Sequence, residues 1–390
     1  MEEGDSRKQT TPVEEEDLQK ETKSVPLRGD DERLRPAEQF QVPIGEALLT
    51  ITGAFKLDLD LQNNLNLRST RERDRFRLTP EFNLDFILAF PQGFSLFTEF
   101  GLEDEVTFDK GDKPENKFKL ELKEAFAEVP LPLPIPSLLR VGRQQLFEPR
   151  RWVFNNRQDA VQLSFDPYPF HLDLFAAARI PSSPDSLRFF DDIFEDRDQV
   201  DFVINSTYGF APGSSIGQYV ILGRKHQNRI ERGNPRDEDP IWIGLRSLGK
   251  PKFKFGRSPF LRPKIWYWID GAFVTGTVGT KDIRGFAVDV GGSYIFEKLQ
   301  FKPYITLGYA FGSGDSNSTD TVDRNFRQTG FHSNSGKFGG VVSFDYYGVL
   351  FDPELSNLQV FTAGIGFRPI VKSSVDVVYH HYTQHTAVDE

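Results

Sequence analysis

The residues of this sequence best suited to chemistry are the arginines between positions 140 and 157. Five arginines fall in this stretch, against one carboxylate, Glu148. They are Arg140, Arg143, Arg150, Arg151 and Arg157. Because a guanidinium group binds both oxygens of a carboxylate at once, and five such groups would repel one another if left unmatched, the stretch indicates anion binding. The alternative is a solvated loop with ion pairs to neighbouring strands.

A second set of arginines is regularly spaced. Arg71, Arg73, Arg75 and Arg77 have odd numbers, whereas every Phe and Leu from 76 to 90 has an even number. Successive side chains of a strand point to opposite faces, so this pattern predicts one apolar face and one ionic face. The predicted strand is much longer than the usual five or six residues. A soluble sandwich would end such a strand sooner.

The elements that must position these arginines are strands joined by unequal connections. Residues 139–141 and 161–165 alternate in the same way, which places the arginine-rich stretch in a loop between two strands. Tight turns at 91–93 and 166–169 alternate with long polar loops at 109–117, 181–196, 227–238 and 312–337. Tight turns on one side and long loops on the other are typical of outer-membrane barrels.

The composition agrees with a barrel in a membrane. The chain has 390 residues with 37 Phe and no Cys. It has no apolar run long enough for a transmembrane helix. A net charge of -10 argues against nucleic-acid binding. We therefore predict an all-β chain, a transmembrane antiparallel β-barrel of the bacterial outer membrane with about sixteen strands.

The sequence divides into two parts. Residues 1–40 are polar, acidic and without apolar periodicity, so they are expected to form a flexible tail in the periplasm. Residues 41–390 are expected to form the barrel, with the long loops outside the cell.

The polar face of the predicted strands should carry the function, because a barrel of this size leaves a channel unless loops fold into it. Carboxylates on neighbouring strands could instead pair with the arginines, and this alternative stays open. Arg143 shares the parity of Val141, so it would face the lumen only through a bulge near Gly142, or else lie at the rim. The predicted pore-lining residues are Arg71, Arg73, Arg75, Arg77, Arg140, Arg143, Arg150, Arg151, Arg157, Asp159, Arg179 and Arg327.

Several short motifs resemble the alginate export porin family. They are Gly142-Arg143-Gln144, Trp152, Asp159, residues 308–315 (GYAFGSGD), 326–330 (FRQTG), 354–358 (ELSNL) and 378–380 (VYH). The resemblance runs from about Ala47 to about Tyr382. It implies an eighteen-stranded outer-membrane barrel whose Arg- and Lys-lined lumen passes an anionic polysaccharide out of the periplasm.

Two features depart from that family. The chain ends at Glu390 without the further strands and terminal aromatic residue of the family, so either C-terminal strands are missing or the barrel closes differently. Residues 341–347 (VVSFDYY) carry Asp345 and no arginine, although the family has arginines there. The second departure weighs against alginate itself as the substrate.

The leading functional hypothesis is passive export of an anionic, alginate-like exopolysaccharide through an arginine-lined lumen. The alternative is a diffusion porin for small solutes or small anions. A third class, an outer-membrane enzyme such as a lipase, has no supporting motif, and we expect no enzyme activity and no cofactor. The expected partners are the polysaccharide, outer-membrane lipid and periplasmic export proteins, with a monomeric channel.

One loop offers oxygen ligands for a metal. Asp315, Asp320 and Asp323 lie in the stretch 312–323 (GSGDSNSTDTVD) and form a weak candidate for calcium. The stretch lacks the glutamate and the fixed spacing of an EF-hand, so a solvated loop is the simpler interpretation.

Overall fold

The computed structural model describes ten segments of the chain. They are residues 40–62, 75–109, 114–178, 199–225, 238–251, 264–317, 319–336, 344–349, 351–370 and 373–387. The predicted tail up to residue 39, together with Arg71, Arg73 and Arg179 of the predicted pore-lining set, lies outside these segments.

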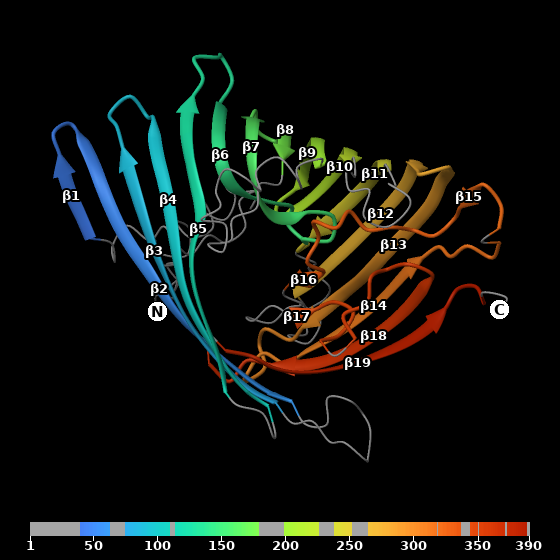
Figure 1. Ribbon diagram of the computed structural model, residues 1–390. Coiled ribbons are helices and arrows are strands. Elements are labelled where there is room, and N and C mark those ends of the chain that lie inside the picture. Colours follow the sequence, from blue (N-terminus) through green and yellow to red (C-terminus); the bar gives the residue numbers. More distant parts are fainter. Residues whose placement is uncertain are drawn as a thin grey trace, which may run out of the picture.

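The described segments form strands joined by turns and loops (Figure 1). Over these residues, no helix has both the length and the apolar character needed to span a membrane. The strands are β1 (Phe40–Ile44), β2 (Ala47–Gln62), β3 (Arg75–Ala89), β4 (Ser95–Asp109), β5 (Glu115–Pro130), β6 (Ser137–Phe147), β7 (Asn155–Phe165), β8 (Phe170–Ala178), β9 (Gln199–Ala211), β10 (Ser214–Lys225), β11 (Glu238–Gly249), β12 (Lys264–Val278), β13 (Lys281–Ile295), β14 (Tyr304–Gly312), β15 (Val322–Asp323), β16 (Ser335–Gly336), β17 (Phe344–Asp345), β18 (Leu358–Phe367) and β19 (Val375–Gln384).

Neighbouring strands along the chain pair with one another in antiparallel register. The pairs run from β1–β2 to β13–β14 and continue with β14–β18 and β18–β19. The two-residue strands β15, β16 and β17 belong to the long connection between β14 and β18. Within the described segments, sixteen strands form the antiparallel wall, and the two-residue strand β15 adds a short parallel pairing to β13 at Asp282–Val322 and Ile283–Asp323. The fold confirms the predicted all-β antiparallel barrel of about sixteen strands.

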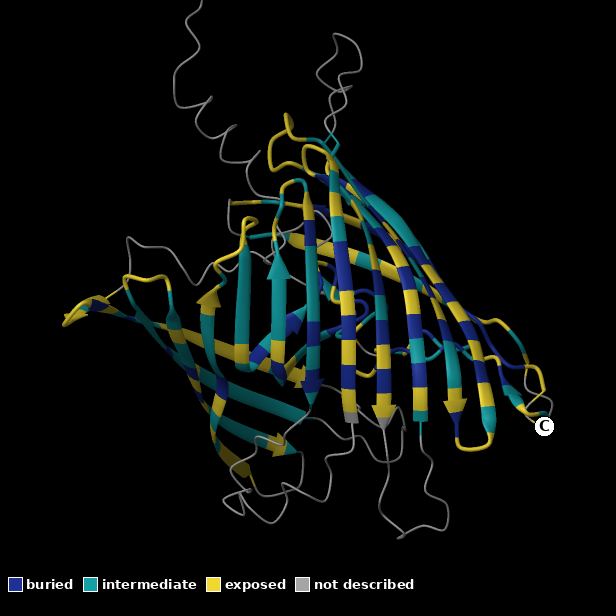
Figure 2. Cartoon of the chain, turned by 90° about the horizontal axis from the view of Figure 1, so that it is seen from above, coloured by how far each residue is buried: buried dark blue, intermediate teal, exposed yellow. Residues whose placement is uncertain are grey.

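The wall owes its two faces to the alternation in the sequence. Phe82 of β3 and Phe100 and Leu102 of β4 are exposed on the outer face, as expected for side chains that meet lipid. Asp85 and Glu99, which are partners in the β3–β4 register, are buried on the other face. Figure 2 shows long strands striped along their length, with buried residues next to exposed ones.

The β6–β7 hairpin leaves the wall part-way along its length. The β5–β6 register ends at the pair Ala125–Arg143, whereas the β6–β7 register continues to Phe147–Asn155. Gly142 lies at the point of departure with a φ of 126°, a backbone conformation that other residues rarely adopt. Beyond this point the hairpin, green in Figure 1, curves into the interior of the barrel.

Candidate functional site

The tip of the β6–β7 hairpin meets the β14–β18 connection inside the barrel. Phe154 forms a parallel bridge with Phe331, and the backbone NH of Asn155 donates to the carbonyl of Phe331 at 2.5 Å. The hydroxyl of Thr329 donates to the carbonyl of Val153. These contacts join two loops that are far apart in the sequence into one body, here called the lumenal plug (residues 148–154 with 313–317, 319–336, 344–349 and 351–357).

The hairpin tip is organised around the carboxylate of Glu148. One carboxylate oxygen accepts a hydrogen bond from the backbone NH of Arg150 at 2.7 Å, and the other accepts bonds from the backbone NH groups of Trp152 and Val153. A buried carboxylate needs such donors because an unpaired charge in a dry interior is costly. Glu148 is fully buried and fixes the turn that presents Arg150 and Trp152.

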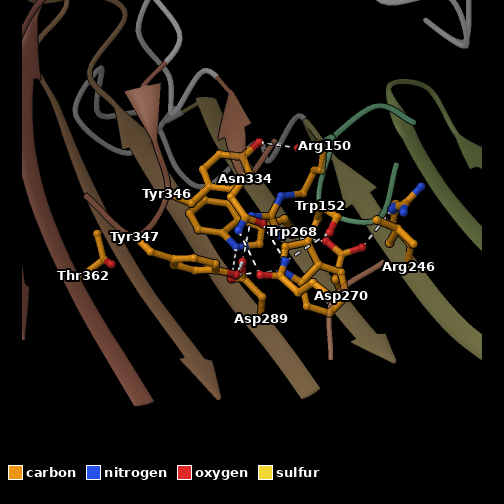
Figure 3. Close-up of polar contacts among 12 residues, drawn as sticks. Arg150, Trp152, Arg246, Trp268, Asp270, Asp289, Asn334, Tyr346, Tyr347 and Thr362 are labelled. Atoms are coloured by element: carbon orange, nitrogen blue, oxygen red, sulfur yellow. Dashed lines mark hydrogen bonds and ion pairs between the residues drawn. The ribbon is translucent and has the colours of Figure 1, made fainter. Parts of the chain in front are cut away.

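A chain of alternating charges connects the lumenal plug to the wall (Figure 3). Arg246 of β11 is in register with Asp270 of β12, which is in register with Asp289 of β13. Arg150 donates to Asp270 at 2.7 Å and to Asp289 at 2.9 Å. Arg246 lies 3.0 Å from Glu148 and 2.8 Å from Asp270. Each arginine therefore bridges two carboxylates, and all five charges are buried.

Aromatic side chains enclose this buried charge chain (Glu148, Arg246, Asp270, Arg150 and Asp289). The guanidinium of Arg150 lies over the ring of Tyr346 at 4.4 Å and near that of Trp268 at 5.1 Å. Trp152 donates to the hydroxyl of Tyr347 at 2.7 Å, and that hydroxyl donates to Asp289 at 2.9 Å. The rings bury the Arg150 guanidinium, and the Tyr347 hydroxyl and the Trp268 indole NH both donate to the Asp289 carboxylate.

The electrostatics of Arg150 follow from this enclosure. Burial by itself lowers the pKa of the Arg150 guanidinium, but the carboxylates of Asp289 and Asp270 outweigh it and hold the pKa well above the ordinary value. Arg150 is thus charged and forms ion pairs with two buried carboxylates. Its chemistry is that of an anchor for the lumenal plug, since both of its terminal nitrogens already donate to protein carboxylates.

The predicted ladder of arginines is only partly described, and its described members are paired. Arg75 of β3 lies 2.7 Å from Asp109 of β4, and Arg77 lies 3.7 Å from Glu105. The two arginines are on the face opposite the exposed apolar residues, as the alternation predicts. Their partners are carboxylates of the neighbouring strand.

The arginines of the β6–β7 hairpin also meet carboxylates. Arg140 donates to Glu128 at 2.9 Å and lies over the ring of Phe126. Arg143 forms an ion pair with Asp159 at 2.9 Å across the hairpin. The registers of β6 with β5 and with β7 show no shift at Gly142, so there is no bulge at this position. Instead, the hairpin leaves the wall there.

Bending of the hairpin brings Arg157 over the inner face of the nearby strands β4 and β5. This β7 side chain lies 3.9 Å from Glu99 of β4 and 3.8 Å from Glu124 of β5, and it stays about one-third exposed at 37%. Arg151, at the hairpin tip, is exposed and has a φ of 58°. Its carbonyl accepts hydrogen bonds from the backbone NH groups of Ser333 and Asn334, which hold this uncommon conformation in place.

The aspartates of the predicted calcium loop lie in the β14–β18 connection, and each meets an arginine. Arg324 contacts Asp315 at 3.3 Å and Asp320 at 2.8 Å, and Arg327 pairs with Asp323. Within the described residues, no group of three or more His, Cys, Asp or Glu side chains is placed to hold a metal ion. The loop is also less solvated than the sequence suggests, since Asp315 and Asp323 are buried.

Sequence reasoning missed most of the buried charge chain. Arg150 is in the predicted set, but Glu148 was noted only as a lone carboxylate, and Arg246, Asp270 and Asp289 were not singled out. A signal was present: Asp270 and Asp289 stand at inward positions of otherwise apolar strands. A charge at such a position requires a partner from elsewhere in the chain.

Comparison with known proteins decides the family. The family model for alginate export matches residues 49–390, almost the whole described wall together with the lumenal plug. The chain belongs to the alginate export family. The resemblance seen in the short motifs is thereby confirmed. No curated protein sequence matches.

Solved structures with a similar arrangement are outer-membrane porins of Pseudomonas aeruginosa. OccK11 (OpdR) has a TM-score of 0.46 and 13% identity, over 87% of this chain and 79% of that one. OccK7 (OpdD) has a TM-score of 0.45 and 12% identity, over 86% of this chain and 94% of that one.

Membership of the alginate export family places the barrel in the outer membrane. The protein is an outer-membrane channel, and its apolar outer face meets the lipid of that membrane. The family match indicates a channel or transporter.

Proposed function

We propose that this outer-membrane channel passes an exopolysaccharide from the periplasm to the outside by passive diffusion. The observation that carries the proposal is the family match over residues 49–390. A polymer-conducting channel needs a hydrophilic lumenal face to replace the water around the sugar hydroxyl groups. The inner face of β2–β5 supplies such a surface, with charged side chains at alternate positions.

The sequence favours an anionic, alginate-like polymer and a lumen lined by arginines. Among the described members of the predicted set, Arg151 and Arg157 best suit contact with such a polymer. Arg151 is exposed at the tip of the lumenal plug, and Arg157 is partly exposed beside β4 and β5. Arg150 does not suit that role, because its guanidinium is buried against Asp270 and Asp289.

A second function, diffusion of small solutes, is favoured by one observation. The lumenal plug is packed against β11, β12 and β13 through buried side chains, so it occupies part of the lumen. A narrowed lumen suits small solutes as well as a single extended polymer chain. The monomeric state and the periplasmic export partners are further parts of the proposal.

Deletion of the gene separates the two functions. Loss of polymer secretion, restored by the wild-type gene, supports export. Unchanged secretion with altered uptake of small solutes would overturn the export proposal and favour the diffusion porin. The variant Arg151→Ala tests whether the exported polymer is anionic, because it removes an exposed positive charge at the tip of the lumenal plug. Its control is Arg284→Ala, which removes an exposed positive charge from the outer face.

A further inference from the structure

Two connections on the same rim of the wall meet and carry an exposed apolar patch. One is the turn 296–303 between β13 and β14, and the other begins with residues 368–370, directly after β18. The backbone NH of Arg368 donates to the carbonyl of Phe301 at 2.6 Å, which joins the two connections. The exposed apolar side chains at this junction, here called the rim patch, are Leu299, Phe301, Phe367 and Ile370.

An uncommon backbone conformation presents Phe301 at this junction. Phe301 and the next residue, Lys302, have φ values of 63° and 42°, a region that bulky residues rarely adopt. The NH of Lys302 donates to the carbonyl of Leu299 at 3.0 Å and closes the turn. The ring of Phe301 then meets the ring of Phe367, with 6.4 Å between the centroids. Such a conformation is costly, and where it persists it points to a function for the side chain that it presents.

The rim patch continues the lipid-facing surface of the barrel. Phe367 is the last residue of β18, and Phe361 and Ile365, which share its parity, are exposed on the outer face. Val360 and Thr362, at the other parity, are buried on the lumenal side. The ring that packs against Phe367 therefore lies on the lipid side. The patch extends the apolar outer surface beyond the ends of the strands.

Positive charge gathers beside the rim patch. Lys298 and Lys302 are exposed in the turn, and neither forms an ion pair with a residue that the structure describes. Glu297, the acid of this turn, lies 3.3 Å from Lys264 at the start of β12. No Lys or Arg occurs in the five other short connections between β1 and β10 on this rim, which are residues 45–46, 90–94, 131–136, 166–169 and 212–213.

The short turns of an outer-membrane barrel face the periplasm, so this rim borders the phospholipid leaflet of the membrane. Basic side chains at the edge of an apolar, aromatic surface attract anionic headgroups, while the surface itself contacts acyl chains. We propose that the rim patch, with Lys298 and Lys302, binds an acidic phospholipid, phosphatidylglycerol, of the periplasmic leaflet. The two lysines pair with the headgroup phosphate, and Phe301 and Ile370 contact the acyl chains. The site is on the outer face and does not depend on what the channel passes.

The first measurement is native mass spectrometry of the wild-type barrel, released from micelles that contain equal amounts of phosphatidylglycerol and phosphatidylcholine. The protein should retain phosphatidylglycerol in preference, and added salt should weaken the preference through screening. Equal retention of the two lipids overturns the inference. This measurement needs no variant, so its result stands even where a substituted rim fails to fold.

The same measurement on a double variant assigns the site. In Lys298→Gln, Lys302→Gln the retention of phosphatidylglycerol should fall about twentyfold, because each lysine near an anionic surface contributes about fivefold. The matched control is Lys56→Gln, Lys117→Gln, which removes two exposed lysines from β2 and β5 and changes the net charge equally. Equal losses in the two variants contradict a site at the rim patch.

The last measurement tells lipid from a protein partner. Phe301→Trp, in a barrel shown to be folded by gel mobility, adds a fluorophore to the rim patch. Its emission in liposomes should be quenched more strongly by brominated phosphatidylglycerol than by brominated phosphatidylcholine. Equal quenching by the two lipids overturns the headgroup preference. Quenching by neither lipid places the turn outside the membrane, overturns the inference and favours a periplasmic protein on this surface.

Discussion

Arg150 and Asp289 are 139 residues apart in the chain, yet Nη2 of Arg150 lies 2.9 Å from Oδ2 of Asp289. The pair connects the tip of an inward-bent hairpin to strand β13 on the wall. The same guanidinium also binds Asp270 on β12. This relationship fixes the lumenal plug in place, and the narrowing of the channel follows from it.

Replacing Arg150 with Ala should strongly destabilise the protein. The change leaves the buried carboxylates of Asp270 and Asp289 without their shared counter-charge, and breaking one partner of a buried ion pair costs about 3–5 kcal/mol. The measurement is the urea midpoint of refolding in detergent micelles. Arg151→Ala is the matched control, because that neighbouring side chain is exposed. Equal midpoints for the two variants would contradict the anchoring role.

Gly244 should not tolerate Ala. A methyl group at this position would overlap the phenol ring of Tyr219, its register partner on β10, which is almost fully buried. Overpacking of this kind costs about 1–3 kcal/mol. At Gly271 the nearest atom to a new methyl group is 4.0 Å away, so Gly271→Ala should fold normally. Barrel yield on unheated gels compares the two, and equal yields would show that this contact does not constrain the strands.

His332 should make stability depend on pH. It lies in the plug between β15 and β16, and burial lowers its pKa from 6.5 to about 4. Between these values the unfolded chain binds a proton that the folded protein does not. Stability is therefore complete above pH 6.5, falls as the pH drops towards 4, and changes no further through this group below it. The loss amounts to at most about 3 kcal/mol.

The test of this pH dependence is a urea midpoint at several pH values between 7 and 4. In His332→Gln the fall between pH 6.5 and 4 should be smaller than in the wild type. His381→Gln, which changes an exposed histidine on β19, serves as the control. An unchanged pH profile in the His332 variant would assign the dependence to other groups.

Much of the wall could be predicted because its signal is local. The even-numbered Phe and Leu residues between 76 and 90 predict a strand, and β3 spans Arg75–Ala89. Alternation needs no knowledge of distant residues, since each strand must show an apolar face to lipid. The same reasoning found the strands on both sides of the arginine-rich loop.

The lumenal plug could not be predicted in this way. Whether the loop around Arg150 stays in water depends on Asp270 and Asp289, and no periodicity connects residues so far apart. Arg151 is exposed and Arg150 is buried, yet the two residues are adjacent and of the same type. The sequence alone therefore cannot tell which of them anchors the plug. The bend at Gly142 brings the hairpin tip to the wall, where Arg150 binds Asp270 and Arg151 stays exposed.

The lumenal plug narrows an open outer-membrane channel, and single-channel conductance tests this most directly. The comparison is between the wild type and a variant in which residues 149–153 are replaced by a Gly-Ser linker of equal length, after both are shown to be folded by gel mobility. The wild type should form discrete ion-conducting channels, and the variant should conduct more because the hairpin tip no longer binds β12 and β13. A folded wild type without channels, or a folded variant with unchanged conductance, would contradict the account.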